Sequence, residues 1–566
     1  MSPMRALTRK PIGPLAIALT LGVFSGCKGC VSKNTGEGAS GNTAQAQTTP
    51  GGPQFVVDCK AATKPISPYI YGIAFDITGH SDWKEVRQFE LNPSGRRLGG
   101  NAATRYNWEH GTAFNHGSDW IFANNGYADA PAPFYDMFMQ GNAEKKLQSA
   151  VMVQTIGWVA KDMTSVSFPI AKVGTQKVFD DARGGGNGIR PDGSEIPPGP
   201  PTNTSIPSTP EFQARYVKKL RELAIKRGVP GPRVYILDNE PSLWNSTHRD
   251  VHPEPLSYDE LLKLTKEYAT AVRDADPEGL IAGPAAFGWT ELFFSAKDAK
   301  AGFHLKPDRR AHDDMPLAAW YLKELRAHEQ KTGKKLLDLF DYHFYPQAEG
   351  IGMGKEGKTD MNTSAIRIRS TRGLWDPEYK DESWIKEPQR LLPRLREWID
   401  QYYPGLGIQI GEWNFGAEGD ISSGLATAEA LGRFADNGVK TAYYWPYPKL
   451  DSPAFYAFRA FRNYDGKGGK FEDNLVPAKP MENTSIWASK DASGKHMVVV
   501  LLNYSPYRTV ESTVALDACG AVASTKHFVY TKDKKAFADG KTAASGPGVT
   551  ASLPPYSISV LDITLK

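Results

Sequence analysis

Eight short strand-like runs, separated by stretches with helical character, constrain the fold of this chain more than any other feature. The runs are mainly apolar and have the length of buried strands. Strands that alternate with helices predict a parallel sheet, and eight is the number that closes a (β/α)8 barrel. A doubly wound open sheet is the competing architecture, but its glycine fingerprint at a strand-to-helix turn is missing. The runs are residues 69–76, 96–100, 149–160, 233–240, 280–287, 339–346, 408–413 and 441–447.

Amphipathic helices are predicted between these strands. In residues 257–276, Leu261 and Tyr268 fall on one apolar face, and Ser257 with Glu260 forms a capping box at the start. Further helices are expected at 211–227, 316–331 and 387–402, and the Gly- and Pro-rich segment 182–210 is expected to be an excursion over the barrel mouth.

A change of pattern divides the chain into two folded parts. After residue 479 only strand-like runs separated by turns remain, at 484–489, 497–504, 510–516, 527–530 and 556–565. We therefore predict a barrel over 69–478 and a small all-β sandwich over 479–566, which residues 54–68 would complete with an N-terminal strand.

The N-terminus predicts export. Basic residues precede an apolar run at 15–24, and small residues then lead to Cys27, so residues 1–27 resemble a lipoprotein signal with Cys27 as the lipidated residue. Phe24 stands where such signals usually have Leu, and ordinary secretion is the alternative. Residues 28–53, rich in Gly, Ser and Thr, predict a flexible tether. Both alternatives place the protein outside the cytoplasm, at the cell surface or secreted.

Charge and cysteine content limit the possible binding partners, disulfides and metal sites. The 566 residues carry 67 basic and 63 acidic side chains, a balance that argues against nucleic acid, and a monomer is expected. Cys27 and Cys30 lie in or beside the export segment, which leaves Cys59 and Cys519 in the folded part of the chain. A disulfide between them is expected if both lie in the sandwich, and two separate thiols are the alternative. No Cys or His cluster has the spacing of a zinc site, so no metal is expected in the chemistry.

Two glutamates follow apolar runs and carry most of the functional information. Glu240 ends the fourth strand-like run and Glu412 the seventh, so a barrel would display both carboxyl groups on one face. A pair of carboxyl groups about 5 Å apart is what glycosidic cleavage with a covalent intermediate requires. Glu240 suits the general acid, Glu412 the nucleophile, and Asn239 a contact to the substrate 2-hydroxyl.

Polar and aromatic residues on neighbouring runs suit a sugar site. Tyr345 is expected to hydrogen-bond the nucleophile, His343 a sugar hydroxyl, and Trp445 to form a stacking floor. Barrel packing is the alternative for the aromatic residues around them.

Four blocks resemble glycoside hydrolase family 44. They are residues 97–109 (Arg-Leu-Gly-Gly-Asn-Ala-Ala-Thr-Arg-Tyr-Asn-Trp-Glu), 117–120, 238–244 (Asp-Asn-Glu-Pro-Ser-Leu-Trp) with 247–253, and 411–414 (Gly-Glu-Trp-Asn). The resemblance implies a barrel joined to a β-sandwich and a retaining endo-β-1,4-glucanase or xyloglucanase, with Glu240 as proton donor and Glu412 as nucleophile.

The same resemblance suggests further site residues. Trp108 and Trp120 are the stacking candidates, and a structural calcium ion is possible, with Asp180 and Asp181 as poor ligands by themselves. Family members often have Trp at the position of Leu98 and Tyr at that of Trp413, which leaves the preferred polysaccharide open. Two other functions remain: a surface glycan-binding lipoprotein without turnover, and a retaining xylanase or mannanase of a related barrel family.

Overall fold

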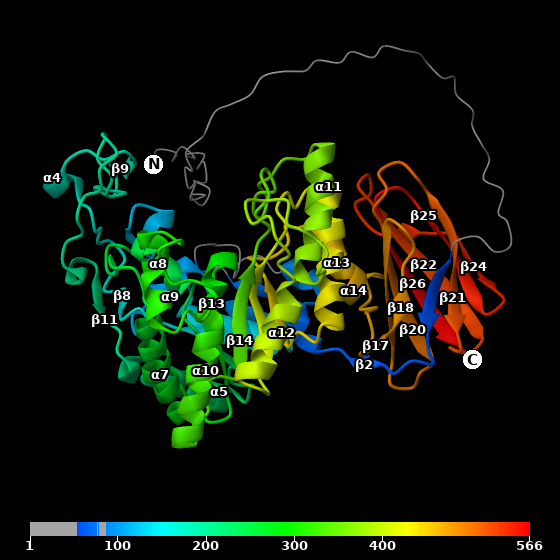
Figure 1. The fold of residues 1–566 in the computed structure, drawn as a ribbon, viewed down its shortest axis with the longest axis horizontal. Helices are drawn as coiled ribbons and strands as arrows, with labels where there is room; N and C mark the ends of the chain where they lie inside the picture. The colour runs from blue at the N-terminus through cyan, green and yellow to red at the C-terminus, as the bar shows by residue number, and fades with distance from the viewer. Residues whose placement is uncertain (1–53, 76, 78–86) are drawn as a thin grey trace, which may run out of the picture. The chain divides into compact units, whose positions relative to one another are not determined.

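Eight parallel strands close into a barrel, which confirms the predicted fold class. The computed structural model describes residues 54–75, 77 and 87–566 (Figure 1). Around the barrel the strands run β3, β4, β7, β12, β13, β14, β15 and β16, each parallel to its neighbours. Their bounds are β3 Gly72–Phe75, β4 Gly95–Leu98, β7 Gln148–Val153, β12 Val234–Leu237, β13 Leu280–Ala286, β14 Leu339–Phe344, β15 Gly407–Trp413 and β16 Thr441–Tyr444.

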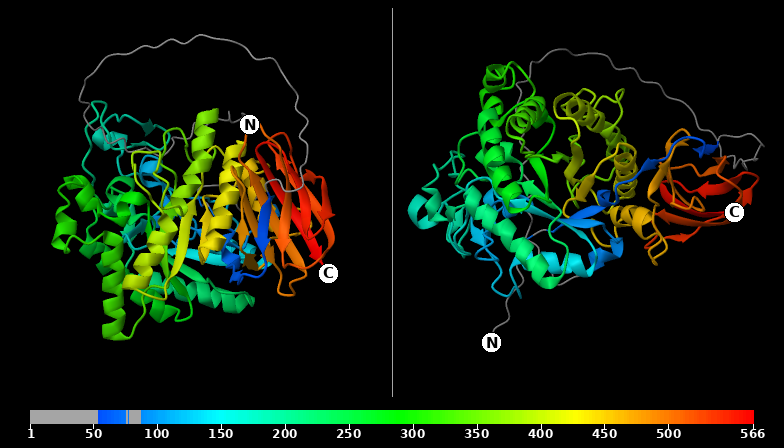
Figure 2. Two further views of the ribbon diagram at one scale, coloured as in Figure 1. Left: turned by 45° about the vertical axis from the view of Figure 1, so that its right-hand side comes forward. Right: turned by 90° about the horizontal axis from the view of Figure 1, so that it is seen from below.

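Helices cover the outside of these strands (Figure 2). In α7 (Tyr258–Ala275) the Ser257 side chain accepts a hydrogen bond from the Glu260 N–H, as the capping box predicts, and Leu261 and Tyr268 are buried. The predicted helix at 387–402 begins four residues later, at Leu391. The other long helices are α3 Phe134–Glu144, α5 Pro210–Arg227, α10 Leu317–Thr332, α11 Met361–Ser370, α12 Leu391–Tyr402, α13 Ile421–Asp436 and α14 Pro453–Arg462.

The predicted strand at 149–160 is two strands. β7 ends at Val153, Gly157 follows with φ +87°, and β8 (Trp158–Ala160) then pairs with β11 (Ser205–Pro207) outside the barrel. The positive φ breaks the extended backbone, so one apolar run serves two sheets. The loops of the barrel contain further short elements. They are α2 Asn101–Thr104, β5 Phe114–Asn115, β6 Asn124–Asn125, α4 Ile170–Val173, β9 Phe179–Asp180, β10 Gly185–Gly186, α6 Trp244–Thr247, α8 Ala296–Ala301 and α9 Pro307–Ala311.

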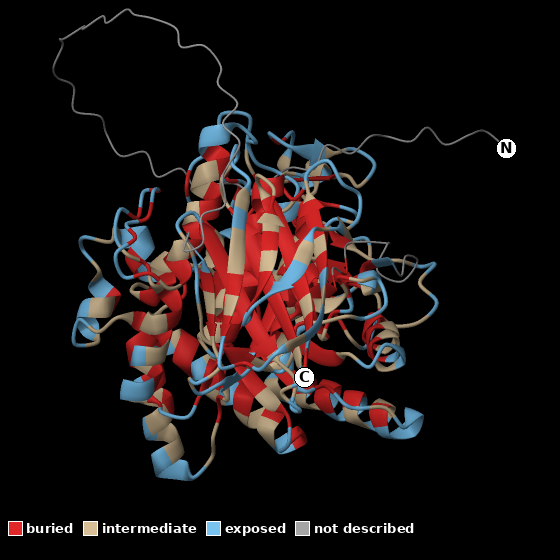
Figure 3. Ribbon diagram, turned by 90° about the vertical axis from the view of Figure 1, so that its right-hand side faces the viewer, coloured by how far each residue is buried: buried red, intermediate tan, exposed pale blue. Residues whose placement is uncertain are grey.

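The remaining strands form a β domain of two sheets (Figure 3). One sheet has the order β18-β1-β21-β25-β24 and the other β2-β17-β19-β20-β26-β22-β23. β1 pairs with β21 in parallel, so the N-terminal segment belongs to this domain. The strands are β1 Phe55–Asp58, β2 Lys64–Pro65, β17 Asn474–Val476, β18 Ala478–Lys479, β19 Thr484–Lys490, β20 His496–Asn503, β21 Val510–Asp517, β22 Val522–Thr531, β23 Ala538–Asp539, β24 Thr542–Ser545, β25 Gly548–Leu553 and β26 Ser557–Leu565.

A disulfide joins the N-terminal segment to the rest of the β domain. Cys59 follows β1 and Cys519 follows β21, and their Cα atoms lie 5.0 Å apart in the bonded pair. The pairing of β1 with β21 brings the two cysteines together, so the alternative of two separate thiols is not what the structure shows.

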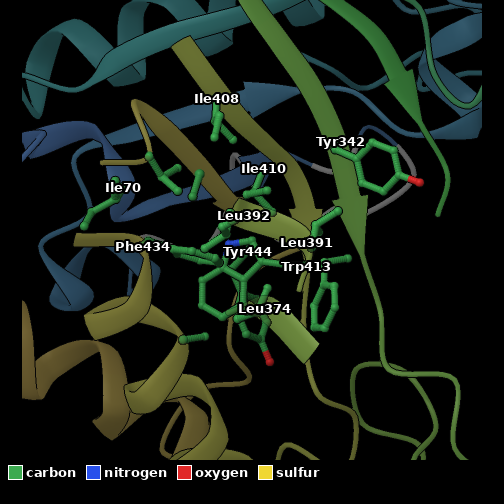
Figure 4. Close-up of a cluster of buried hydrophobic side chains, with 14 of the residues drawn as sticks. Ile70, Tyr342, Leu374, Leu391, Leu392, Ile408, Ile410, Trp413, Phe434 and Tyr444 are labelled. Carbon is green, nitrogen blue, oxygen red and sulfur yellow. The ribbon is translucent and has the colours of Figure 1, made fainter. Parts of the chain in front are cut away.

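One hydrophobic cluster extends from the barrel wall into the β domain. Trp413, Phe434 and Tyr444 lie in it (Figure 4). The same cluster includes residues of β20 and β26. At its edge Glu429 of α13 accepts a hydrogen bond from Trp487 Nε1 at 3.3 Å and another from Arg433 at 2.7 Å. Burial of this shared apolar surface stabilises the packing of the β domain against the barrel.

The predicted signal and tether, including Cys27, fall outside the described residues. Within the described ranges no helix is both long and apolar enough to cross a membrane.

Candidate active site

The two predicted carboxyl groups meet at the carboxyl end of the barrel strands. Glu412 lies near the end of β15, and Glu240 follows β12 at the start of a short 3-10 helix, Pro241–Leu243. Asp238 and Glu240 have φ values of 63° and 46°, a backbone conformation that residues other than glycine seldom adopt. Backbone strain of this kind persists only where the surrounding structure enforces it, which is common at functional sites.

A compact cluster contains both glutamates. Glu240, His343 and Glu412 each contribute one side-chain atom, and these three atoms lie within 4.8 Å of one another. The strand register explains the arrangement, because His343 of β14 pairs with Glu412 of β15. One oxygen of Glu240 therefore lies close to one oxygen of Glu412, as expected from the sequence.

Glu412 accepts hydrogen bonds on both oxygens. Arg97 Nη1 donates to Oε1 at 2.6 Å, and the Tyr345 hydroxyl donates to Oε2 at 2.8 Å. Arg97 is fully buried on β4, and its Nη2 donates to Asn239 Oδ1 at 2.9 Å. A planar guanidinium can serve two acceptors at fixed angles, so Arg97 sets the position of Glu412 relative to the chain that carries Glu240.

Glu240 has a very different environment. Burial raises the pKa of Glu240 to about 8, the charge of Arg97 opposes that rise, and Asp119 adds to it. His343 Nδ1 lies 2.8 Å from Glu240 Oε1. Burial lowers the pKa of His343, so the imidazole is neutral at pH 7 and does not supply a charge that would ionise Glu240. Glu240 is thus a carboxylic acid that keeps its proton near neutral pH.

Two amide side chains extend the hydrogen-bond network of Arg97. Asn239 Nδ2 donates to Asn101 Oδ1 at 3.1 Å, and Asn101 Nδ2 donates to Asp119 at 3.3 Å. Trp244 Nε1 donates to the Asn239 carbonyl at 3.1 Å, which holds the backbone of that residue. Asn239 therefore lies beside Glu240 and against Arg97, where it was expected to bind substrate.

The three predicted tryptophans occupy different surroundings. Trp445 follows β16, is half-buried, and lies 5.8 Å from the Arg97 guanidinium, next to the cluster. Trp120 is half-buried beside Asp119, and the Arg183 guanidinium carbon lies 5.1 Å from the centroid of its ring. Trp108 instead stacks on Tyr216 of α5 at 5.5 Å, within the aromatic packing of that helix.

His343 belongs to the cluster, and Tyr345 lies beside it. Tyr345 contacts Glu412, as expected. His343 is fully buried and contacts Glu240, a position below the acid and not on an exposed groove. Trp413, next to Glu412, is also fully buried and stacks on Phe458 at 5.9 Å, so it packs into the barrel wall.

Several buried polar residues of the site were not assigned roles from sequence. Glu291 is buried and accepts hydrogen bonds from Ser242 Oγ and the Phe287 N–H, both at 2.8 Å. Asp341 is buried below His343 and accepts from Gln409 Nε2 at 2.8 Å. The available signal was a charged side chain inside an apolar run, which is rare unless it is paired.

Among the described residues, one group of histidine, cysteine and carboxylate side chains has metal-like spacing, and it is the cluster itself. Arg97 and Tyr345 already donate to both oxygens of Glu412, and a buried guanidinium would repel a cation there. Asp180 and Asp181 belong to no such group within the described ranges. Calcium binding at these two residues stays a prediction.

Comparisons with known proteins give a consistent family. The sequence pattern of Glycoside hydrolase family 44 matches residues 113–348. The chain is 31% identical over 492 residues to Endoglucanase A of Paenibacillus lautus, a match that covers 82% of this chain but only 65% of that protein.

Solved structures extend the likeness to the whole described fold. CelM2, a bifunctional glucanase-xylanase from a metagenome library, is 33% identical with a TM-score of 0.83, covering 90% of this chain and 99% of CelM2. A xyloglucanase of the same family from Paenibacillus polymyxa, solved with xyloglucan, is 27% identical with a TM-score of 0.72 and the same coverage. With the barrel, the β domain and the paired glutamates in place, the chain belongs to glycoside hydrolase family 44.

Proposed function

We propose that this protein is a retaining endo-β-1,4-glucanase that cuts internal linkages of glucans such as xyloglucan and soluble cellulose derivatives. The observation that carries the proposal is the short distance between the two carboxyl groups, whose nearest atoms lie within 4.8 Å. Retaining glycosidases have carboxyl groups about 5 Å apart, whereas inverting enzymes need roughly 6.5–9.5 Å to admit a water molecule.

The different surroundings of the two groups assign their roles. Glu412 accepts from Arg97 and Tyr345, which orient an oxygen as a nucleophile. Glu240 keeps its proton near neutral pH because burial raises its pKa to about 8. A carboxylic acid and a hydrogen-bonded carboxylate at this distance form the pair that double displacement uses.

The reaction follows in two steps. In the first, a Glu412 oxygen bonds to the anomeric carbon as the glycosidic C–O bond breaks, and Glu240 gives its proton to the departing oxygen. In the second, the Glu240 carboxylate takes a proton from water, whose oxygen attacks the anomeric carbon and releases Glu412. Each step inverts the anomeric carbon, so the β configuration is retained overall.

A panel of carboxymethylcellulose, xyloglucan, glucomannan and xylan tests this function. We expect reducing ends from the glucans with the wild type, and a loss of at least about 100-fold in kcat/KM for Glu240→Gln and Glu412→Gln. Glu109→Gln is the matched control, because Glu109 forms an exposed pair with Arg215 at 2.9 Å and its side chain bonds to neither Glu240 nor Glu412. Equal activity in all four proteins would reject the site.

The same panel separates the alternatives. Binding without reducing ends in the wild type would indicate a glycan-binding protein without turnover, and preference for xylan or mannan would indicate a different backbone. Proton NMR of the first products on a glucan must show the β-anomer, and an initial α-anomer would contradict the double displacement.

We also propose that the protein is exported and anchored by a lipid on Cys27. Basic residues, an apolar run and small residues before Cys27 support this proposal. Mass spectrometry of the N-terminal peptide from the membrane fraction should detect a diacylglyceryl-modified Cys27. An unmodified N-terminus in the culture medium would instead show ordinary secretion.

A further inference from the structure

A groove lies outside the candidate active site, between the barrel and the β domain. Its volume is about 1100 Å³. The barrel side is formed by the first residues of α11 and α13, and the other side by β22 to β25 and the turns around Tyr507 and Tyr556. Figure 1 shows α11 and α13 on the side of the barrel that faces the β domain.

The barrel side of this groove is connected directly to the catalytic strands. α11 is the first helix after β14, which carries His343, and α13 is the first helix after β15, which carries Glu412. Loops that follow barrel strands lie at the carboxyl end of the barrel, where the candidate active site also lies. A polysaccharide chain bound at the active site can therefore continue towards the groove over one face of the molecule.

Two tyrosines give the groove an apolar surface of the kind that sugars stack on. Tyr507 is 71% exposed, and Met361 opposite it is 60% exposed. The Tyr507 hydroxyl donates to Met361 Sδ at 2.9 Å, so the Tyr507 side chain reaches the barrel side of the groove. The Tyr507 and Tyr556 backbone N–H groups both donate to Ser505, so the two rings come from adjacent turns.

The charge of the groove favours a neutral ligand. Its lining contains four carboxylates and three lysines, so neither a polyanion nor a polycation finds a matching field. In the described part of the chain, no hydrogen bond or ion pair engages the side-chain charged groups of Lys532, Lys541, Asp533 or Asp539. Uncommitted donors and acceptors side by side suit hydroxyl groups, each of which donates and accepts.

We propose that this groove is a second binding site for the uncharged β-glucan that the active site cuts, with Tyr507 as its main stacking residue. The inference rests on the proposed function, because that function supplies the ligand. A polymer held at two sites of one molecule gains affinity through effective concentration, whereas a short oligosaccharide occupies only one site. The groove therefore adds affinity for polymers specifically.

Calorimetric titration of a catalytically inactive background tests the site. Glu240→Gln, Glu240→Gln with Tyr507→Ala, and Glu240→Gln with Trp384→Ala are each titrated with soluble xyloglucan and with cellotetraose. Trp384 is the matched control because it is 58% exposed and does not line the groove. We expect Tyr507→Ala to weaken xyloglucan binding about five- to tenfold and to leave cellotetraose binding within about twofold. Trp384→Ala should change neither.

The outcomes separate this site from the proposed function. Unchanged xyloglucan affinity in the Tyr507→Ala protein, or an equal loss in the Trp384→Ala protein, would overturn the groove while cellotetraose still bound at the active site. If the Glu240→Gln protein bound neither ligand and the wild type hydrolysed no glucan, the proposed function would fail, and this inference would fail with it. A single Tyr507→Ala substitution in the wild type should keep cellotetraose turnover and lose efficiency on the polymer.

Discussion

Replacing Glu240 by glutamine removes one proton from the active site at almost constant side-chain volume. Burial raises the pKa of Glu240 to about 8, against the opposing charge of Arg97. With that value, about nine-tenths of the molecules carry the proton at pH 7 and about one-tenth at pH 9. Because the first step needs the proton, kcat/KM of the wild type should be level near neutral pH and fall about tenfold per pH unit beyond about pH 8.

The size of the effect depends on the leaving group. General acid catalysis contributes about 100- to 10,000-fold, so Glu240→Gln should lose that much kcat/KM on a polysaccharide, whose departing alcohol needs a proton. An aryl β-cellobioside with an acidic phenol leaves without one. The variant should therefore still form the glycosyl-enzyme from this substrate, with a burst of phenol, and should not show the alkaline fall in kcat/KM.

The assay is kcat/KM against pH, from about pH 5 to pH 10, for both substrates. Glu291 has a pKa of about 8 as well, so the Glu291→Gln variant must be measured beside it and should keep the alkaline fall. A fall that persists in Glu240→Gln on the aryl substrate, or that disappears in Glu291→Gln, would show that Glu240 does not control the alkaline limb. Azide, which needs no general base, should restore turnover in Glu240→Gln and yield a β-glycosyl azide.

Three further substitutions test the active site and the β domain. A Cβ on Gly100, which has φ +89°, would lie 2.1 Å from the Trp445 ring, so Gly100→Ala should lower kcat/KM about 10- to 100-fold, while Gly174→Ala, with φ +80° and nothing within 4 Å, should not. Burial raises the pKa of Glu291 above that of the unfolded chain, so the folded protein holds this proton more tightly and loses stability as pH rises to about 8. In urea unfolding, Glu291→Gln should therefore gain on the wild type by about 1.4 kcal/mol per unit between about pH 5 and pH 8, and a constant difference would contradict this. Cys59→Ser should lower the free energy of unfolding by about 2–5 kcal/mol, and an unchanged urea midpoint would argue against the disulfide.

The barrel is predictable from sequence because its strands are buried on both faces and its helices on one. That difference gives apolar runs and helical spacing that need no tertiary information. The positions of Glu240 and Glu412 follow from the same pattern, because a charged residue at the end of a buried run must lie at the rim of the sheet. The failure at 149–160 is equally local, since one apolar run conceals the turn at Gly157.

The contacts between strands are less accessible from sequence. Arg97 lies 315 positions before Glu412, and no periodicity reports that its guanidinium ends on that carboxylate. Trp108 illustrates the opposite problem, because a tryptophan in a family block can equally stack on a sugar or on Tyr216, and only the placement of α5 decides what it contacts. Pairing across the barrel depends on which side chains fill its interior, a property of the closed sheet and not of any one strand.

Arg97 has a further consequence for the proposed reaction, because it is bonded to one glutamate and acts electrostatically on the other. Its charge opposes the rise in the pKa of Glu240, and in the free enzyme part of that charge is balanced by Glu412 at 2.6 Å. When Glu412 becomes an ester in the covalent intermediate, it loses its negative charge. Arg97 then acts on Glu240 without that balance, which favours the ionised form of Glu240 at the stage where it must accept a proton from water.

The change can be measured on a trapped intermediate. A 2-fluoro-cellobioside with a good leaving group should accumulate the glycosyl-enzyme, and carbon NMR of labelled glutamate should show the pKa of Glu240 falling from about 8 in the free enzyme by one unit or more. Arg97→Met should abolish most of that fall in pKa, since the variant has no positive charge at this position to favour the ionised form of Glu240. An unchanged pKa of Glu240 in the wild-type intermediate would show that burial alone governs this proton, and that some other group makes Glu240 a base in the second step.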